Sequence, residues 1–198
     1  MAKLLLLRHL ESQWNKENRF TGWTDVPLSQ EGIQSAKNVA GKLVGHKIDV
    51  VYTSPLTRNK ETVRLILKIL NKENLPVVID KALDERNYGE LQGLNKDEVK
   101  KQYGEKKVKL WRRSWDKAPP DGESLQDVYQ RTVPFFKKHI EQDLKKNKNV
   151  LIVASHNSLR ALVKYIEKIT DQDILNTELA SGELKVYEFD KSLNLVVR

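Results

Sequence analysis

The chain alternates short apolar runs with amphipathic segments, and this pattern constrains its fold more than any other feature of the sequence. A short apolar run is typical of a buried strand, whereas apolar residues spaced three and four apart indicate a helix. Strands that alternate with helices are typical of α/β proteins. The pattern predicts strands over residues 3–8, 49–53, 76–79, 150–154, 183–189 and 195–197. It predicts helices over residues 29–44, 123–144 and 158–168, and one more that starts at Ser54-Pro55.

Breaks in this pattern carry information of their own. Pro134 lies inside the helix predicted over residues 123–144 and should kink or split it, because proline lacks a backbone N–H. Three segments, 11–28, 84–94 and 114–122, show neither the apolar run of a strand nor the spacing of a helix. Long irregular segments are usually functional or disordered, and the aromatic residues of the first two favour order. With 198 residues and no repeat or linker, the sequence predicts a single domain over residues 1–198.

Composition limits the classes of protein to which the chain can belong. The absence of cysteine excludes disulfides, thiolate metal sites and a cysteine nucleophile. No apolar run near the N-terminus is long enough for a membrane span or a secretory signal, so we expect a cytoplasmic protein. The formal charge of +8 attracts polyanions, either nucleic acid or small phosphorylated metabolites. Most lysines alternate with acidic residues in predicted helices, which is typical of solvated helix faces rather than of a nucleic-acid stripe.

Basic and imidazole side chains follow the predicted strands where these end. Arg8-His9 follows the first strand, Arg58 follows the second, and His156 follows the fourth. If these strands are parallel neighbours, the side chains meet at the carboxyl edge of the sheet, where open α/β folds bind ligands. A histidine can carry a phosphoryl group, and cations around it stabilise the charge of that group. Each residue alone is more often structural, but their joint placement predicts phosphoryl transfer at His9.

A phosphohistidine mechanism also needs a group that moves protons. Asp84 and Glu85 lie in an irregular segment, and a carboxyl group near phosphate should have a raised pKa that suits this task. A salt bridge from Glu85 to Arg86 is the structural alternative, and spacing does not choose between the two. Lys96 and Arg112-Arg113 add further cations. Neighbouring arginines on a helix point in different directions, so either only one reaches a given site or a substrate with two anionic ends engages both.

Six blocks of sequence occur in a fixed order and cover most of the chain. They are 8-RHLESQWNKENRFTGWTDVPLS-29, 53-TSPLTR-58, 85-ERNYGELQGLNK-96, 111-WRRSW-115, 122-GESL-125 and 157-NSLRALV-163. In these blocks the chain resembles the cofactor-dependent phosphoglycerate mutases of the histidine phosphatase superfamily. The superfamily as a whole shares only the start of the first block and a few charges, so FTGWTDVPLS, LQGLNK and WRRS point to the mutase branch. The resemblance implies a three-layer α/β/α sandwich with a mostly parallel sheet.

The same resemblance implies an isomerase that interconverts 2- and 3-phosphoglycerate in glycolysis and gluconeogenesis. It implies 2,3-bisphosphoglycerate as primer and no metal. His9 would be the nucleophile that becomes phosphohistidine, and Glu85 would be the general acid and base. Arg8, Arg58 and His156 would surround the phosphoryl group. The residues implied to contact phosphoglycerate are Asn15, Thr21, Gly22, Tyr88, Lys96, Arg112, Arg113 and Asn157.

Three positions depart from the family pattern. Leu10 stands where the family has glycine, directly after His9, and predicts an altered anion pocket or a shifted backbone. Asn87 replaces a histidine, which keeps hydrogen bonding but removes a titratable group. The family reads AHGNSLR where this chain reads 154-ASHNSLR-160, so an ungapped match puts Ser155 at the position of the catalytic histidine. We expect His156 to serve instead, because an imidazole helps phosphate chemistry where a serine only hydrogen-bonds; the alternative is that Ser155 faces the site.

Two other functions stay open. A phosphohistidine phosphatase for small phosphate esters would pass the phosphoryl group to water, and Leu10 and the displaced His156 favour it. The sequence ends at Arg198 without the tail that closes the site in longer family members, so we expect water to be excluded less well. The other alternative is a non-catalytic basic protein that binds anions or nucleic acid.

For the main prediction, we expect small phosphorylated three-carbon acids as ligands and no nucleic-acid or membrane partner. We expect the protein to be either a monomer or a homodimer.

Overall fold

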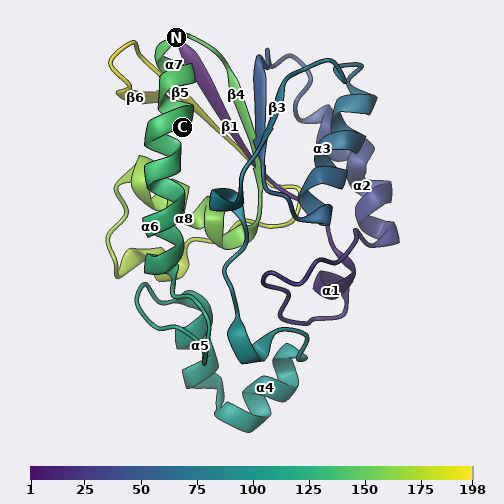
Figure 1. The fold of residues 1–198 in the computed structure, drawn as a ribbon, viewed down its shortest axis with the longest axis vertical. Coiled ribbons are helices and arrows are strands. Elements are labelled where there is room, and N and C mark those ends of the chain that lie inside the picture. The colour runs from purple at the N-terminus through teal and green to yellow at the C-terminus, as the bar shows by residue number, and fades with distance from the viewer. Residues whose placement is uncertain (198) are drawn as a thin grey trace.

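The computed structural model describes residues 1–197 and is built on one six-stranded sheet, with helices on both faces (Figure 1). Strands β3, β2, β4 and β1 lie side by side in this order and run parallel, and β5 and β6 extend the β1 edge in antiparallel pairing. The fold is therefore a three-layer α/β/α sandwich with a mostly parallel sheet, as predicted. The strands are β1 (Ala2–Arg8), β2 (Val50–Thr53), β3 (Val77–Ile79), β4 (Val150–Ala154), β5 (Leu184–Phe189) and β6 (Leu195–Val197).

The leucine run of β1 is continuous because the helix layers cover both faces of the sheet. Successive strand residues point to opposite faces, so Leu5 and Leu7 pack with α2 and α3, whereas Leu4 and Leu6 pack with α6 to α8. The helices are α1 (Gln13–Lys16), α2 (Gln30–Gly41), α3 (Thr57–Ile69), α4 (Lys96–Tyr103), α5 (Glu105–Arg113), α6 (Leu125–Phe135), α7 (Glu141–Lys145) and α8 (His156–Glu167). A π-helix, η3 (Phe136–Ile140), joins α6 to α7, and short 3-10 turns are η1 (Lys81–Leu83), η2 (Gly89–Leu91) and η4 (Asp173–Asn176).

The helix boundaries show where sequence periodicity was sufficient and where it was not. The long helix is interrupted after Pro134 as predicted, and the π-helix that follows is consistent with the backbone N–H that proline lacks. The predicted start at Ser54-Pro55 is wrong, because α3 begins at Thr57, whose N–H and hydroxyl bind the Asp25 carboxylate at 2.7 and 2.8 Å. The predicted start at Ser158 is also wrong. Helix α8 begins at His156, where polar residues precede its apolar period.

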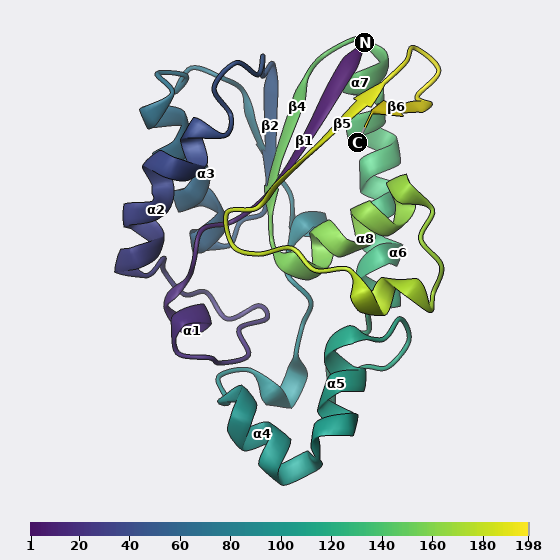
Figure 2. The same ribbon diagram turned by 180° about the vertical axis from the view of Figure 1, so that it is seen from behind.

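The carboxyl ends of β1, β2 and β4 meet at one edge of the sheet, so the parallel arrangement required for a shared site is present. Helices α1, α4 and α5 lie beyond this edge (Figure 1). Seen from behind in Figure 2, the segment over residues 177–183 crosses the same edge before it enters β5. Gly182 N–H donates to the Arg8 carbonyl at 3.1 Å, and Arg8 Nη1 donates to the Leu179 carbonyl at 2.5 Å. These elements enclose the space beyond the carboxyl edge of the sheet.

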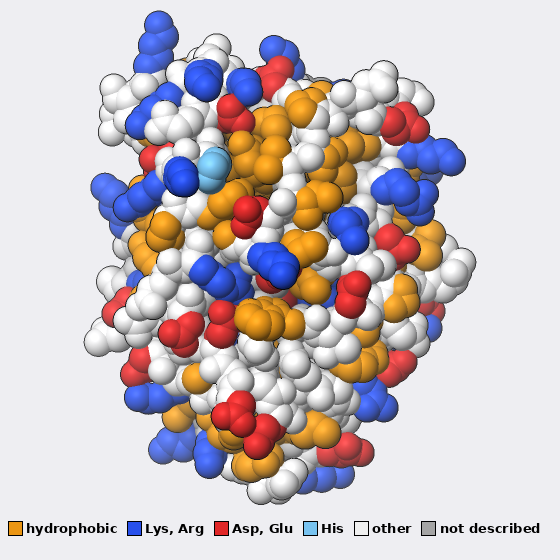
Figure 3. All heavy atoms as spheres, in the orientation of Figure 1, with side chains coloured by type: hydrophobic (Ala, Val, Ile, Leu, Met, Phe, Trp, Pro, Cys, Tyr) orange, Lys and Arg blue, Asp and Glu red, His pale blue; other side chains and the backbone are white. Residues whose placement is uncertain are grey.

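Charges on the surface are mixed. On the face shown in Figure 3, lysine and arginine side chains are scattered with aspartate and glutamate among them rather than gathered into a stripe. This distribution agrees with the solvated helix faces expected from the sequence. No helix within residues 1–197 is both long and apolar enough to cross a membrane.

Candidate active site

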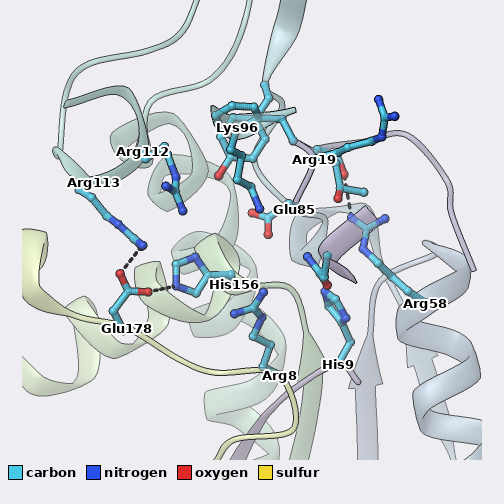
Figure 4. Close-up of a pocket in the computed structure, with 15 residues that line it drawn as sticks. Arg8, His9, Arg19, Arg58, Glu85, Lys96, Arg112, Arg113, His156 and Glu178 are labelled. Atoms are coloured by element: carbon cyan, nitrogen blue, oxygen red, sulfur yellow. Dashed lines mark hydrogen bonds and ion pairs between the residues drawn. The ribbon is translucent and has the colours of Figure 1, made fainter. Parts of the chain in front are cut away.

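A pocket at the carboxyl edge of the sheet gathers the predicted site residues (Figure 4), with the exception of Asn157, which does not line it. The sheet contributes Arg8 and His9, and the surrounding loops and helices supply the rest. The lining residues are Arg8, His9, Asn15, Arg19, Phe20, Thr21, Gly22, Arg58, Glu85, Tyr88, Lys96, Arg112, Arg113, His156 and Glu178. We call Arg8, His9 and Arg58 the phosphoryl pole, and Lys96, Arg112 and Arg113 the second pole. Their catalytic and binding roles stay predictions.

His9 is held in the protonation state that a nucleophile needs. Its Nδ1 lies 2.6 Å from the Leu10 carbonyl oxygen, which can only accept, so Nδ1 carries the hydrogen. Nε2 therefore carries a lone pair rather than a hydrogen, as the predicted role of His9 as nucleophile requires. Burial, followed by the charges of Arg58 and Arg8, lowers the pKa of His9 well below its ordinary value. The ring is thus neutral at pH 7, with a bare Nε2.

The two arginines of the phosphoryl pole are fixed by backbone carbonyls. Arg58 donates to the Gly22 carbonyl at 2.7 Å and to the Thr24 carbonyl at 3.0 Å. Figure 4 shows Arg8 and Arg58 on opposite sides of His9. Arg8 Nε and Thr21 Oγ1 are buried, and neither has a hydrogen-bond partner among the described residues. Buried donors without partners are costly, so these atoms are suited to bind an anion that enters the pocket.

Glu85 presents one carboxylate oxygen to the pocket because the other is fully engaged. Its Oε1 accepts from Arg86 N at 2.7 Å, Asn157 N at 3.1 Å and Asn157 Nδ2 at 2.9 Å. The alternative of a side-chain salt bridge with Arg86 is not found among the described residues, because Glu85 contacts the backbone N–H of Arg86 while the Arg86 guanidinium donates to Tyr88 and Arg112. Asp84, the other candidate carboxyl group, does not line the pocket.

The pKa of Glu85 is shifted in the direction opposite to our prediction. Burial acts to raise the pKa, but His156, the N–H donors of Arg86 and Asn157, and Arg58 outweigh burial and hold it well below the ordinary value. At pH 7 His156 is neutral, so the N–H donors and Arg58 are the groups that stabilise the Glu85 carboxylate at that pH. Glu85 is therefore ionised and able to accept a proton. A phosphoryl anion beside it would act in the raising direction that we expected.

Asn157 contacts two side chains of the pocket lining, those of Glu85 and Tyr88. Its Nδ2 lies 3.2 Å from the Tyr88 hydroxyl oxygen, which also accepts from Arg86 Nη2 at 3.2 Å. With both of these bonds accepted, the hydroxyl hydrogen of Tyr88 is available to donate into the pocket. Asn157 thus positions two lining side chains but does not line the pocket itself, and the contact with phosphoglycerate that the resemblance implies stays a prediction.

Local structure also explains the placement of Asn15 and the Thr21-Gly22 turn. Asn15 Oδ1 accepts from Ser12 N and Ser12 Oγ in a capping box at the start of α1, so its amide hydrogens are the part free for a ligand. Gly22 has a φ of +56°, and a Cβ there would lie 2.1 Å from Gln92 Oε1. A side chain at this position would be strained by the positive φ and would displace the Gln92 side chain, which accepts from Trp23 N at 2.7 Å.

Both arginines of the second pole reach the pocket, so the alternative in which only one does is wrong. The reason is that α5 ends at Arg113 and its last carbonyls are clamped by buried arginines. Arg86 Nη2 donates to the Arg112 carbonyl at 3.0 Å, and Arg160 Nη2 donates to the Arg113 carbonyl at 3.0 Å. Cations at a helix C-terminus are favoured by the helix dipole. Lys96 lies beside this pair, and burial and then Arg112 lower its pKa.

His156, and not Ser155, faces the pocket. His156 Nε2 lies 3.1 Å from Glu178 Oε2, and Glu178 Oε1 forms an ion pair with Arg113. Burial lowers the pKa of His156 to about 4, so the ring is neutral at pH 7 and donates through Nε2–H. Burial acts to raise the pKa of Glu178, but the bond to His156 and the charge of Arg113 lower it to about 2. Ser155 Oγ instead accepts from Asn59 Nδ2 at 3.1 Å in the interior.

The other two departures lie outside the pocket lining. Leu10 is fully buried among residues packed against α2 and α3, and its N–H donates to Thr62 Oγ1 at 3.1 Å. Its φ is not positive, so leucine is accommodated without the glycine conformation. Its side chain does not line the pocket, whereas its carbonyl orients His9. Asn87 Oδ1 accepts from Gly89 N at 2.8 Å and stabilises the turn below the pocket.

Three lining residues were missed by our reading of the sequence. Arg19 and Phe20 lie inside the first of the six blocks, so the block itself was the signal that could have indicated them. Glu178 lies in a segment without any motif, and nothing distinguishes it locally from other surface glutamates. Within residues 1–197, no group of three or more His, Cys, Asp or Glu side chains is placed to hold a metal ion.

Comparisons with known proteins agree with this geometry. The model of the histidine phosphatase superfamily (branch 1) matches residues 4–198. The 2,3-bisphosphoglycerate-dependent phosphoglycerate mutase of Cytophaga hutchinsonii is 44% identical over 195 residues, which cover 98% of this chain and 91% of that protein. The phosphoglycerate mutase of Schizosaccharomyces pombe is 46% identical, and the match covers 95% of this chain and 90% of that protein. The solved structure of Bacillus stearothermophilus YhfR has a TM-score of 0.86 at 26% identity, and the match covers 100% of this chain and 95% of that chain. The α-ribazole phosphatase from Shigella flexneri has a TM-score of 0.82 at 25% identity, and the match covers 99% of this chain and 94% of that chain.

Proposed function

Because the chain belongs to branch 1 of the histidine phosphatase superfamily, we propose that it interconverts 2- and 3-phosphoglycerate through a phosphohistidine at His9. The relatives at 44% and 46% identity, which carry the name phosphoglycerate mutase, support this activity. The observation that carries the proposal is the presence of two cationic poles in one pocket. A phosphoglycerate has a phosphate at one end and a carboxylate at the other, and so offers an anion to each pole.

The pocket also fits 2,3-bisphosphoglycerate as the primer. The cations of both poles, together with the unpartnered Arg8 Nε and Thr21 Oγ1, are suited to a ligand with two phosphates. The phosphoryl pole would hold one phosphate and the second pole the other. When bound, the primer would supply the phosphoryl group that charges His9.

The side chains divide the work of transfer between them. His9 Nε2 attacks phosphorus and forms the N–P bond while the P–O bond of the ester breaks, and Arg8 and Arg58 stabilise the charge on the peripheral oxygens. Glu85 Oε2 takes the proton of an incoming substrate hydroxyl as that oxygen attacks phosphohistidine and the N–P bond breaks. In the second half, His9 attacks the other phosphate and Glu85 returns the proton to the leaving oxygen. Atoms and protons therefore balance over one cycle.

A phosphatase is the second candidate, and Glu178 is the observation that favours it. Its carboxylate occupies part of the second pole, where it competes with the carboxylate of a phosphoglycerate. The likeness to the α-ribazole phosphatase from Shigella flexneri also supports this candidate. In a phosphatase, water takes the phosphoryl group from His9, and Glu85 accepts a proton from that water.

Labelling tests whether either enzyme function is correct. Incubation with 2,3-bisphosphoglycerate should give an acid-labile phosphoenzyme, because phosphohistidine hydrolyses in acid. His9→Ala should abolish the label, whereas His139→Ala, which changes an exposed histidine outside the pocket, should leave it intact. A wild-type protein that takes up no label would contradict both candidates.

A coupled assay separates the two candidates. Conversion of 3-phosphoglycerate is followed with and without 2,3-bisphosphoglycerate, and phosphate release is measured in parallel. A mutase should isomerise rapidly in a primer-dependent way with little phosphate release. Release of phosphate without isomerisation would favour the phosphatase.

A further inference from the structure

Glu178 places a carboxylate where the pocket otherwise recruits anions. Its Oε1 pairs with Arg113 and its Oε2 accepts from His156 Nε2 at 3.1 Å, so it bridges the second pole and the imidazole (Figure 4). The side chain of Glu178 is 53% exposed, whereas that of Arg113 is 21% exposed and that of His156 is 11% exposed. The carboxylate therefore approaches its partners from the solvent side of the pocket.

The backbone around Glu178 does not depend on this bridge. Arg8 Nη1 donates to the Leu179 carbonyl at 2.5 Å, and Gly182 N–H donates to the Arg8 carbonyl at 3.1 Å. Leu179 is fully buried. The segment stays anchored when the carboxylate lets go, so the side chain can swing into solvent by rotamer changes alone.

We propose that Glu178 is a specificity-determining residue: an internal carboxylate that holds Arg113 and His156 until the second anionic group of a ligand displaces it. This inference rests on the proposed function, because it names what the second pole selects. A ligand with a single phosphate binds the phosphoryl pole and leaves the bridge in place. A ligand with a second anion must break the bridge, and it then gains Arg113 and the Nε2–H of His156.

Two ligands that differ only in the second anion test this role. Glycerol 3-phosphate has the skeleton of 3-phosphoglycerate with a hydroxymethyl group in place of the carboxylate. Glu178→Gln removes the competing charge but keeps the size of the side chain and an oxygen that can accept from His156. By calorimetric titration, the variant should bind 3-phosphoglycerate about fivefold more tightly than wild type, which is the order expected for a half-exposed ion pair. Its affinity for glycerol 3-phosphate should change by less than about twofold.

The control is Glu31→Gln, which breaks the ion pair with Lys16. Glu31 has the same 53% side-chain exposure and lies outside the pocket lining, so its loss should change neither affinity. Glu178→Ala serves as a second variant and should give the same shift as the glutamine variant. Equal tightening of both ligands would reduce the effect to general electrostatics and overturn the proposal.

Two further outcomes would also overturn it. Unchanged affinities would show that Glu178 does not compete with ligands. A fall in kcat for every phosphate ester, without a change in binding, would make Glu178 a positioning residue for His156 instead. The titration needs no turnover, so it can fail in a protein that passes the mutase assay, and it can succeed in one that fails that assay.

Discussion

The two poles of the pocket are built in different ways. At the phosphoryl pole, His9 is almost fully buried, its Nδ1 is tied to a backbone carbonyl, and Arg58 is tied to two more. At the second pole, the charge of Arg113 is paired with the half-exposed Glu178. A transferring phosphoryl group needs donors that do not reorganise, whereas recognition can use a pair that opens. In the proposed function, the rigid pole would carry the chemistry and the adjustable pole the selectivity.

The largest expected effect tests the chemistry proposed for the rigid pole, through Glu85, which lines the same pocket. Glu85→Gln keeps the shape of the side chain but removes its ability to accept a proton, so kcat should fall by about 10³-fold. Labelling of His9 should fall less, because the glutamine amide can still donate a hydrogen bond to the leaving oxygen, whereas it cannot accept the proton of an incoming hydroxyl. Stopped-flow turnover and single-turnover labelling measure the two steps. Glu90→Gln, an exposed neighbour outside the pocket, is the control. Equal loss of both steps would argue against proton transfer by Glu85.

The next effect concerns His156, which lies between the poles. Its pKa in the folded protein is about 4, against an ordinary value of 6.5, so the folded state binds fewer protons than the unfolded state between these values. Stability therefore falls as pH drops from 7 to 4, by about 3 kcal/mol from this residue. His9 acts in the same direction.

Urea unfolding at pH 7 and at pH 4 measures this dependence. His156→Gln should lose less stability on acidification than wild type, because its share of the proton uptake is gone. His139→Gln changes an exposed histidine and should behave as wild type does. Identical acid sensitivity of His156→Gln and wild type would contradict the lowered pKa.

A smaller effect is expected at the adjustable pole. Arg112→Gln removes a cation of the second pole, so kcat/KM for 3-phosphoglycerate should fall by about 30-fold, the order of one lost charged hydrogen bond. Hydrolysis of para-nitrophenyl phosphate, which has no second anion, should change little. Lys109→Gln on the exposed side of α5 is the matched control. Equal losses with both substrates would erase the distinction between the poles.

The smallest effect tests which of the two neighbours at the start of α8 serves the pocket. Ser155→Ala leaves the buried Asn59 amide with one partner fewer, so the free energy of unfolding should drop by about 1 kcal/mol. Turnover should stay within about twofold of wild type because Ser155 does not line the pocket. Denaturant unfolding and the coupled assay measure both. The exposed Ser192→Ala is the control. A tenfold loss of turnover at wild-type stability would assign Ser155 a role in catalysis.

Much of the site could be predicted because it follows from local patterns. Strand β1 ends where the leucine run meets Arg8, and parallel strands bring Arg58 and His156 to the same edge. The direction of the pKa shift at Glu85 could not be predicted, because it depends on N–H donors 72 residues away in the chain. Glu178 was missed for the same reason, since its partners lie in other elements.

By itself, the sequence determined the alternation of strands and helices, the cations at the strand ends and the family blocks, because these are written in local periodicity and short motifs. Only the tertiary structure decided that Leu10 turns into the core, that His156 rather than Ser155 faces the pocket, and that both Arg112 and Arg113 reach it. It alone placed the carboxylate of Glu178 between the second pole and the imidazole. Such contacts join residues that are distant in the chain, and their geometry is set by packing of whole elements rather than by neighbours in sequence.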